Sequence, residues 1–247
     1  MLNSAGKSAL LLLAISAPLS AQAETAVRFV GEARSINGGE LYYTETHEQI
    51  GQCREGLWRP DSHEVTYRDP NGDTIATKTM DYSVSRQRPG FELDEPRFDE
   101  RMQVRNEDDR RVRIDWRTPE GEDESFEANM PSDGVIDAGF SELVRQNWDR
   151  LTEDGERVRI SFLAPTRGEF YNFEVRPSAR EALDGEHVFQ IRPRGWVSRW
   201  FVDDIYLGYD DEGRLTDYFG LTNLRETSEE NYTAHIRYDF EQGADCR

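Results

Sequence analysis

Residues 111–117, RVRIDWR, alternate apolar and charged side chains along their whole length. Successive side chains of an extended strand point to opposite faces, so Val112, Ile114 and Trp116 share one face and the charged residues share the other. This pattern predicts a strand of an antiparallel sheet that has one buried face and one solvated face.

The same period of two recurs along the chain, and turn residues separate the runs. Further alternating runs lie at 158–162, 171–175 and 234–240, and turn sequences lie at 37–39, 69–72, 119–121 and 211–213. No linker or fixed repeat interrupts the pattern. We therefore expect an all-β fold: a single curved antiparallel sheet, half-barrel-like, of about ten strands, in one domain spanning 24–247.

One stretch departs from this pattern. Residues 139–151, GFSELVRQNWDRL, carry apolar side chains at helical spacing and predict a helix over about 138–153. Asp137 is placed to cap its first turn, and Gly155 can adopt the left-handed conformation just past its end. The apolar stripe must pack on the concave face of the sheet. It comprises Phe140, Leu143, Val144, Trp148 and Leu151.

Two roles are open for this helix. It either fills the trough of the sheet as a plug of the core, or covers a cavity for an apolar ligand as a lid. The lid hypothesis predicts a ligand site between the helix and aromatic residues of the sheet. The candidate ligand-binding residues are Phe140, Val144, Trp148, Tyr171, Phe173, Trp200 and Phe201.

The N-terminus has the three regions of a secretory signal peptide. Lys7 precedes the apolar run 9–15, and small residues at 21–23 form a cleavage site, so we expect 1–23 to be removed. The alternative is an anchored N-terminal helix, but the run is too short to span a membrane. No other segment is apolar enough for a transmembrane helix. These features predict export to the periplasm, or beyond the cell.

The chain has two cysteines, Cys53 and Cys246, an even number in a sequence expected to be exported. Disulfides persist in oxidising compartments, and two lone cysteines without a CxxC spacing make a poor metal site. We expect a structural disulfide that joins the C-terminus to an early strand.

The formal charge is −19, and loss of Lys7 with the signal peptide would make it −20. A negative field of this size repels phosphates, which excludes nucleic acid as a partner. Adaptation to concentrated salt and ordinary selection for solubility explain the acidity equally well.

Motifs for catalysis are absent. The sequence has no G-x-S-x-G, no HExxH and no phosphate-binding glycine loop, so we expect no catalytic residues and no cofactor. The four histidines stand singly on predicted strands, where a surface or hydrogen-bonded role is usual. The pairs Asp203–Asp204 and Asp210–Asp211 could hold a divalent cation, but 210–213 is better explained as a turn, and we predict no metal site.

Two stretches carry a resemblance to known families. Residues 136–151, IDAGFSELVRQNWDRL, and 209–226, YDDEGRLTDYFGLTNLRE, are similar to a family of uncharacterised secreted gammaproteobacterial proteins. The layout of a sheet with a helix midway also resembles the periplasmic Lol carriers of lipoproteins. That resemblance implies a curved sheet that holds acyl chains on its concave side.

The best-supported expectation is a periplasmic carrier or sensor for an apolar ligand, such as a lipid or acyl chain. The alternative is a non-catalytic envelope scaffold or protein-interaction module, whose helix is only a core plug and whose surface recruits an envelope protein. An enzyme is a third possibility, but no constellation of residues supports it.

Overall fold

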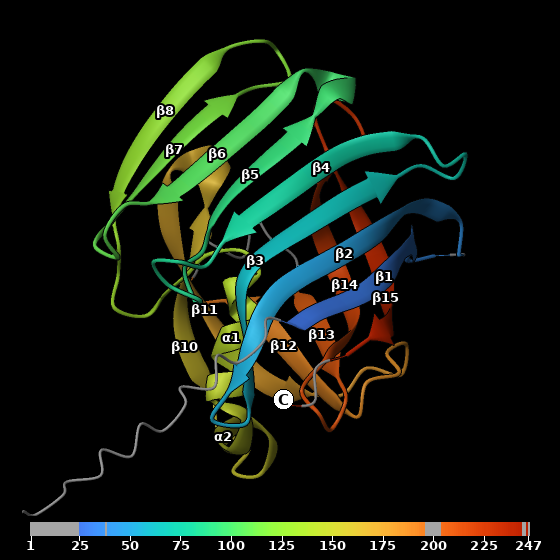
Figure 1. Cartoon of the computed structure of the whole chain (residues 1–247), viewed down its shortest axis with the longest axis vertical. Helices are drawn as coiled ribbons and strands as arrows, with labels where there is room; N and C mark the ends of the chain where they lie inside the picture. Colours follow the sequence, from blue (N-terminus) through green and yellow to red (C-terminus); the bar gives the residue numbers. More distant parts are fainter. Residues whose placement is uncertain (1–24, 38, 196–203, 244–245, 247) are drawn as a thin grey trace, which may run out of the picture.

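The computed structural model describes residues 25–37, 39–195, 204–243 and 246, and it consists mainly of one large sheet (Figure 1). The N-terminal half contributes β1 (Thr25–Ser35), β2 (Leu41–Arg54), β3 (Leu57–Arg68), β4 (Thr74–Asp81), β5 (Gly90–Glu95), β6 (Glu100–Asn106), β7 (Arg111–Arg117) and β8 (Asp123–Asn129). The C-terminal half contributes β9 (Gly134–Val135), β10 (Val158–Ala164), β11 (Glu169–Ser178), β12 (His187–Pro193), β13 (Ile205–Tyr209), β14 (Leu215–Arg225) and β15 (Asn231–Gln242).

Nearly every strand pairs with its neighbour in sequence. The order is β8-β7-β6-β5-β4-β3-β2-β1-β15-β14-β13-β12-β11-β10-β9, and the β1–β15 pair joins the two halves. All pairs are antiparallel except the short parallel pair of β9 with β10. Such a meander needs only short connections, as the turn sequences predicted.

The connection between β8 and β9 forces this sheet to curl. A flat sheet of this strand number would be about 67 Å wide at ~4.8 Å per strand. Yet β8 and β9 lie at opposite ends of the order and are consecutive in the chain, and the step from Asn129 to Gly134 spans at most about 18 Å. The two ends of the sheet therefore face each other, and a Cβ on Gly168 of the β10–β11 turn would overlap Phe126 of β8.

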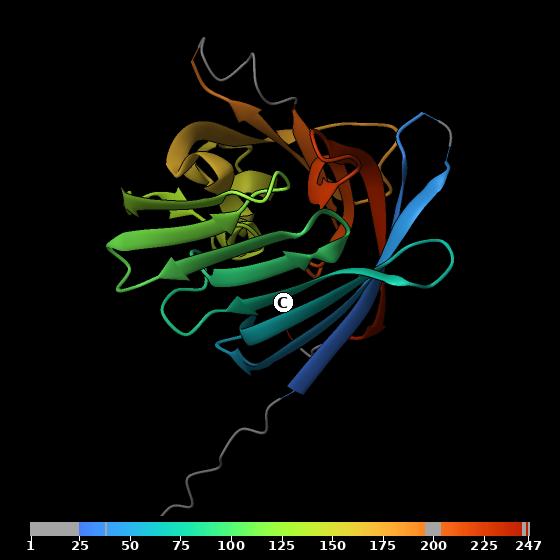
Figure 2. The same cartoon turned by 90° about the horizontal axis from the view of Figure 1, so that it is seen from above.

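Seen from above, the N-terminal and C-terminal strands form two facing walls with the helical segment between them (Figure 2). Three clusters of buried side chains share this one sheet. In β7, Val112 and Ile114 are fully buried while Arg111 is exposed, which confirms the alternation predicted there.

The predicted strand count was wrong: among the described residues the sheet has fifteen strands rather than about ten. Two hairpins turn through short 3-10 helices that open with proline, Pro96–Phe98 and Pro165–Arg167, instead of the glycine turns found at Gly56, Gly72, Gly121 and Gly213. Two more strands are too short to show a period, since β9 has two residues and β13 has five. Local sequence patterns do not reveal such strands.

The single predicted helix is divided into α1 (Gly139–Gln146) and α2 (Trp148–Thr152). The division falls at Asn147, whose φ of −113° and ψ of 21° are not helical. The predicted cap was also wrong, because Ala138 occupies the N-cap position and Asp137 takes the left-handed conformation with φ of 47°. Gly155 has φ of 63°, as predicted for a residue past the helix end.

Cys53 of β2 and Cys246 form a disulfide with their Cα atoms 6.0 Å apart, which confirms the predicted pairing. The bridge closes a sequence separation of 193 residues and fits an oxidising, exported location. Among the described residues, no helix is both long and apolar enough to cross a membrane.

Candidate functional site

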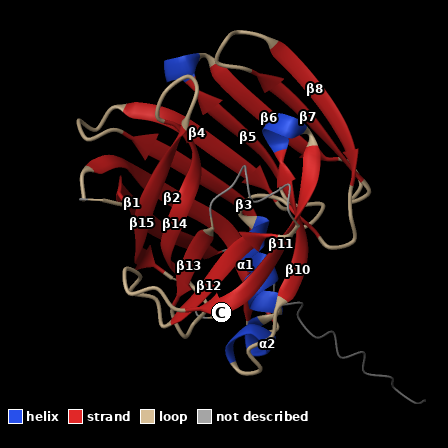
Figure 3. Cartoon of the chain, turned by 180° about the vertical axis from the view of Figure 1, so that it is seen from behind, coloured by secondary structure: helices blue, strands red, loops and turns tan. Residues whose placement is uncertain are grey.

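The predicted ligand residues fall into one packed cluster. Five of the seven meet there: Phe140, Val144, Trp148 and Phe173 are buried together, and Tyr171 packs against them from β11. Trp200 and Phe201 lie outside the described residues. The whole predicted helical stripe, including Leu143 and Leu151, is buried in this cluster with β10 to β13, and Figure 3 shows α1 and α2 behind these strands.

Trp148 is the centre of the contact between helix and sheet. Its ring meets those of His187, Phe189 and Tyr209 edge-on, at centroid distances of 5.0, 6.3 and 6.2 Å. Burial among these groups raises the pKa of Tyr209 to about 12. Such edge-to-face packing stabilises a core, and it favours a plug role for the helix over a lid role.

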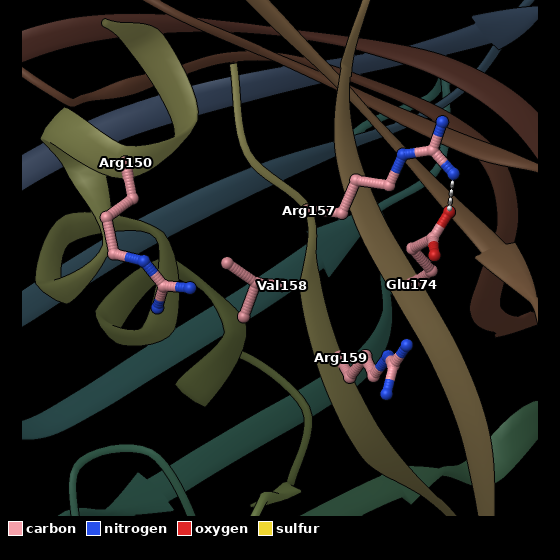
Figure 4. A pocket seen from close by; sticks show the side chains of 5 residues that line it. All are labelled: Arg150, Arg157, Val158, Arg159 and Glu174. Carbon is pink, nitrogen blue, oxygen red and sulfur yellow. Dashed lines mark hydrogen bonds and ion pairs between the residues drawn. The ribbon is translucent and has the colours of Figure 1, made fainter. Parts of the chain in front are cut away.

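A hollow of about 510 Å³ lies beside α2 and β10, but it is lined mainly by charged side chains (Figure 4). Arg150 pairs with Glu156 at 2.8 Å, and Arg157 pairs with Glu174 at 3.4 Å. Val158 is the one apolar residue of its lining. This surface does not suit an apolar ligand.

Some of the polar side chains that the sheet buries lie elsewhere, on and beside the face of β2 that carries Tyr43, Glu45 and His47. Directly paired residues of antiparallel strands share a face, so Tyr67 of β3 lies beside Glu45. The next strand places Lys78 on this face, and its ammonium reaches Asp137 just before α1. This face is therefore the inner one, between the two walls.

Gly31 opens the space on the other side of Glu45. It pairs with Glu45 across β1–β2 and with Tyr238 across β1–β15. A Cβ on Gly31 would lie 2.8 Å from Cε1 of Tyr238, so the tyrosine ring lies across the missing side chain. Glu45 thus stands between two tyrosines, Tyr67 and Tyr238.

Four tyrosines of this face share one electrostatic environment: Tyr43, Tyr67, Tyr218 and Tyr238. We call these four residues together with Glu45 the inner-face site. Burial raises the pKa of each phenol, and the Glu45 carboxylate raises it further. Tyr218 and Tyr238 nevertheless keep part of their surface exposed. Both side chains therefore lie half-buried on the inner face of the sheet.

A chain of hydrogen bonds leads away from Glu45. His47 Nε2 lies 2.8 Å from Glu45 Oε2, and His47 Nδ1 lies 2.9 Å from His63 Nε2. His63 Nδ1 lies 3.5 Å from the amide nitrogen of Gln49. Trp58 Nε1 donates to the Gln49 oxygen at 2.9 Å.

The chemistry of the two ends fixes the protons of this chain. An indole N–H can only donate, so Gln49 turns its oxygen to Trp58 and its NH₂ toward His63. His63 then carries its proton on Nε2 and donates to His47, which in turn donates to Glu45. In this arrangement each imidazole donates through Nε2, and the chain of donors ends at the Glu45 carboxylate.

The surroundings of His63 agree with a neutral ring. Burial lowers its pKa well below the ordinary value, and the neighbouring His47 and Lys78 lower it further. Phe29 stacks on the His47 ring at a centroid distance of 4.2 Å. The expectation that each histidine stands singly was wrong for His47 and His63, because the β2–β3 hairpin brings them together.

Lys78 of β4 and Asn223 of β14 both contact Asp137, at the start of the helical segment. Lys78 Nζ lies 2.5 Å from Asp137 Oδ2 and 4.8 Å from the centre of the Phe91 ring. Asn223 of β14 donates to the same carboxylate oxygen at 2.9 Å. Asp137 therefore joins β4 and β14 rather than capping α1.

The possible cation ligands of the sequence have other partners. Asp210 accepts a hydrogen bond from Arg214, Asp211 accepts one from His187, and the Gly213 N–H donates to the Asp210 carbonyl in the turn expected there. Asp203 is outside the described residues. Within the described ranges, no group of three or more metal-ligating side chains is placed to hold an ion.

Sequence reasoning missed Glu45, His47 and His63 as a group. A signal was present, since all three occupy inward positions of alternating strands, where polar residues are rare. Only the register of β2 and β3 brings them within hydrogen-bonding distance.

Known proteins offer no guide to this site. The chain matches no known protein family, and neither a curated protein nor a solved structure is similar to it.

Proposed function

We propose that this chain is an exported carrier or sensor that holds an apolar ligand, such as a lipid or acyl chain, between the walls of the curled sheet. The observation that carries this proposal is the state of Tyr218 and Tyr238, which are enclosed by protein yet partly accessible. Side chains in that state suit a site for a ligand that is mainly apolar and has a polar end.

The features of an exported protein support a periplasmic setting for this carrier. The N-terminal 23 residues have the composition of a signal peptide, and the Cys53–Cys246 bridge is stable in an oxidising compartment. A curled sheet with an internal helix is also the layout that the sequence resemblance to the Lol carriers implied. In this proposal the ligand lies against the inner-face site, and α1 and α2 pack on β10 to β13 as part of the core.

Native mass spectrometry of protein purified from the periplasm, combined with lipid extraction, tests the proposal. We expect a lipid-sized adduct that organic solvent removes, and a Tyr238→Ala variant should retain less of it. Tyr42→Ala provides a matched control, since it removes a partly buried tyrosine ring from the other face of β2. Protein that is free of any adduct and binds no added lipid would contradict the proposal.

A second candidate function is a non-catalytic envelope scaffold or protein-interaction module. The packing of Trp148 against three rings favours it, because a helix that is part of the core needs no ligand. Adduct-free protein whose unfolding is insensitive to lipid would support this alternative.

A further inference from the structure

We propose that the inner-face site recognises an organic ammonium cation, and that the ligand is a cationic amphiphile. This inference rests on the proposed function, since it names the polar end of the ligand held there. It follows from the charge of Glu45, from the aromatic faces around it and from a hydroxyl that lacks a partner.

Glu45 provides a negative charge inside the protein. Its side chain is 7% exposed, and among the described residues no lysine or arginine pairs with it; its one close ionisable partner is His47, whose Nε2 lies 2.8 Å from Glu45 Oε2. Lys78, a cation on the same face, is matched by Asp137 at 2.5 Å. A buried carboxylate without a lysine or arginine partner is costly to desolvate, and a bound cation would offset that cost.

The groups around Glu45 are aromatic rings. Tyr67 is its direct partner on β3, and Tyr238 reaches toward it across Gly31. The raised pKa of both phenols keeps them neutral, so they present uncharged ring faces. Ring faces beside a carboxylate are the surroundings that attract quaternary and substituted ammonium groups through cation–π contact.

Tyr43 supplies an independent sign that a ligand belongs here. Its hydroxyl is fully buried and meets no described group in full hydrogen-bonding geometry; Thr222 is close enough only to lower the pKa of this phenol as a hydrogen-bond partner. Buried polar atoms without a partner are rare in folded proteins, and they often mark the place of an absent ligand or water.

The negative charge of the whole chain also favours a cationic ligand. A formal charge of −19 raises the concentration of cations near the protein and repels anionic amphiphiles. This attraction is general, however, so a test must separate it from recognition at Glu45.

Calorimetric titration with two probes of equal chain length makes this separation. Dodecyltrimethylammonium and dodecanoate are each titrated below their micelle concentrations in 0.3 M NaCl. We expect the cationic probe to bind the wild-type protein at least about tenfold more tightly, the size of a desolvated cation–π and charge contact. Tetramethylammonium, tested in parallel, shows whether the end group binds without its alkyl chain.

Glu45→Gln should reduce the preference for dodecyltrimethylammonium over dodecanoate to less than about twofold. The glutamine keeps an acceptor for His47 but loses the charge. Glu64→Gln is the matched control, since Glu64 is exposed on the outer face of the neighbouring strand and carries the same charge. Tyr238→Leu should weaken only the cationic probe, and Tyr238→Phe should not, which provides a readout if Glu45→Gln fails to fold.

The remaining outcomes contradict either the ammonium inference or the carrier proposal. Equal binding of the two probes overturns the ammonium inference and leaves the carrier proposal standing. Equal loss of preference in Glu45→Gln and Glu64→Gln means general attraction and also overturns the inference. Binding of neither probe contradicts the carrier proposal itself.

Discussion

The guanidinium of Arg225, at the end of β14, donates to both carboxylate oxygens of Glu100 on β6 at 2.8 and 2.9 Å. The two residues are 125 positions apart in sequence, and β14 and β6 belong to opposite walls. Trp116 Nε1 donates to the same carboxylate at 2.8 Å, and the Arg225 N–H donates to Glu95 at 3.1 Å. This network joins the two walls beside the turn between β5 and β6.

Arg225→Met should lower the free energy of unfolding by about 3–5 kcal/mol, because it leaves Glu100 charged and buried without a cation. Urea denaturation followed by tryptophan fluorescence measures the loss. Arg28→Met is the matched control, since the Arg28–Glu48 pair is on the surface and should contribute little. Equal effects of the two substitutions would contradict a structural role for the network.

Trp148→Ala should cost about 3–5 kcal/mol if the helix is a plug, because a large cavity would open among His187, Phe189 and Tyr209. Thermal denaturation with and without added lipid is the measurement. Asp149→Ala, at an exposed position of the same turn, is the control. A small loss that lipid restores would instead indicate a lid.

Stability should decrease as the pH falls below about 6.5, because of His63. An unfolded histidine binds a proton near that pH, whereas burial holds the folded pKa of His63 well below it. The full stability is therefore present above about pH 6.5 and is lost as the pH falls toward the folded pKa.

The slope contributed by one such proton is at most about 1.4 kcal/mol per pH unit. Urea denaturation between pH 7.5 and 5 should show it in the wild-type protein. His63→Gln should remove this part of the slope, and His187→Gln, which is partly exposed, should keep it. An unchanged slope in His63→Gln would mean that another group titrates.

Removal of the disulfide should lower the free energy of unfolding by up to about 5 kcal/mol, since it frees a loop of 193 residues in the unfolded chain. A Cys53→Ser, Cys246→Ser double variant measures the effect in thermal denaturation. Dithiothreitol should shift the wild-type transition to that of the double variant and leave the variant unchanged. A wild-type transition that does not respond to reduction would contradict this role.

Much of the local structure could be predicted because it depends on neighbouring residues. The alternation of Val112 and Ile114 with charged residues, the turn at 210–213 and the stripe from Phe140 to Leu151 each follow from spacing along the chain. The pairing of the cysteines followed from their number, because two cysteines allow only one intramolecular bridge.

The candidate site could not be predicted in the same way. Glu45, Gly31 and Tyr238 come from three strands, and their contact depends on the register of two ladders at once. His47 and His63 are 16 positions apart in sequence, and only the β2–β3 register brings them into contact. A shift of one residue in either ladder would turn these side chains to the outer face.

The sequence by itself determined the residue chemistry, the period of each clear strand, the helical stripe and the single possible disulfide, because these depend on local spacing or on counting. Only the tertiary structure decided the number of strands, the division of the helix at Asn147 and the meeting of Glu45 with the tyrosines. The physical reason is the closure of the sheet: four residues between β8 and β9 must bring the two ends of the strand order together. That constraint acts on all the strands at once, so no single stretch of sequence contains it.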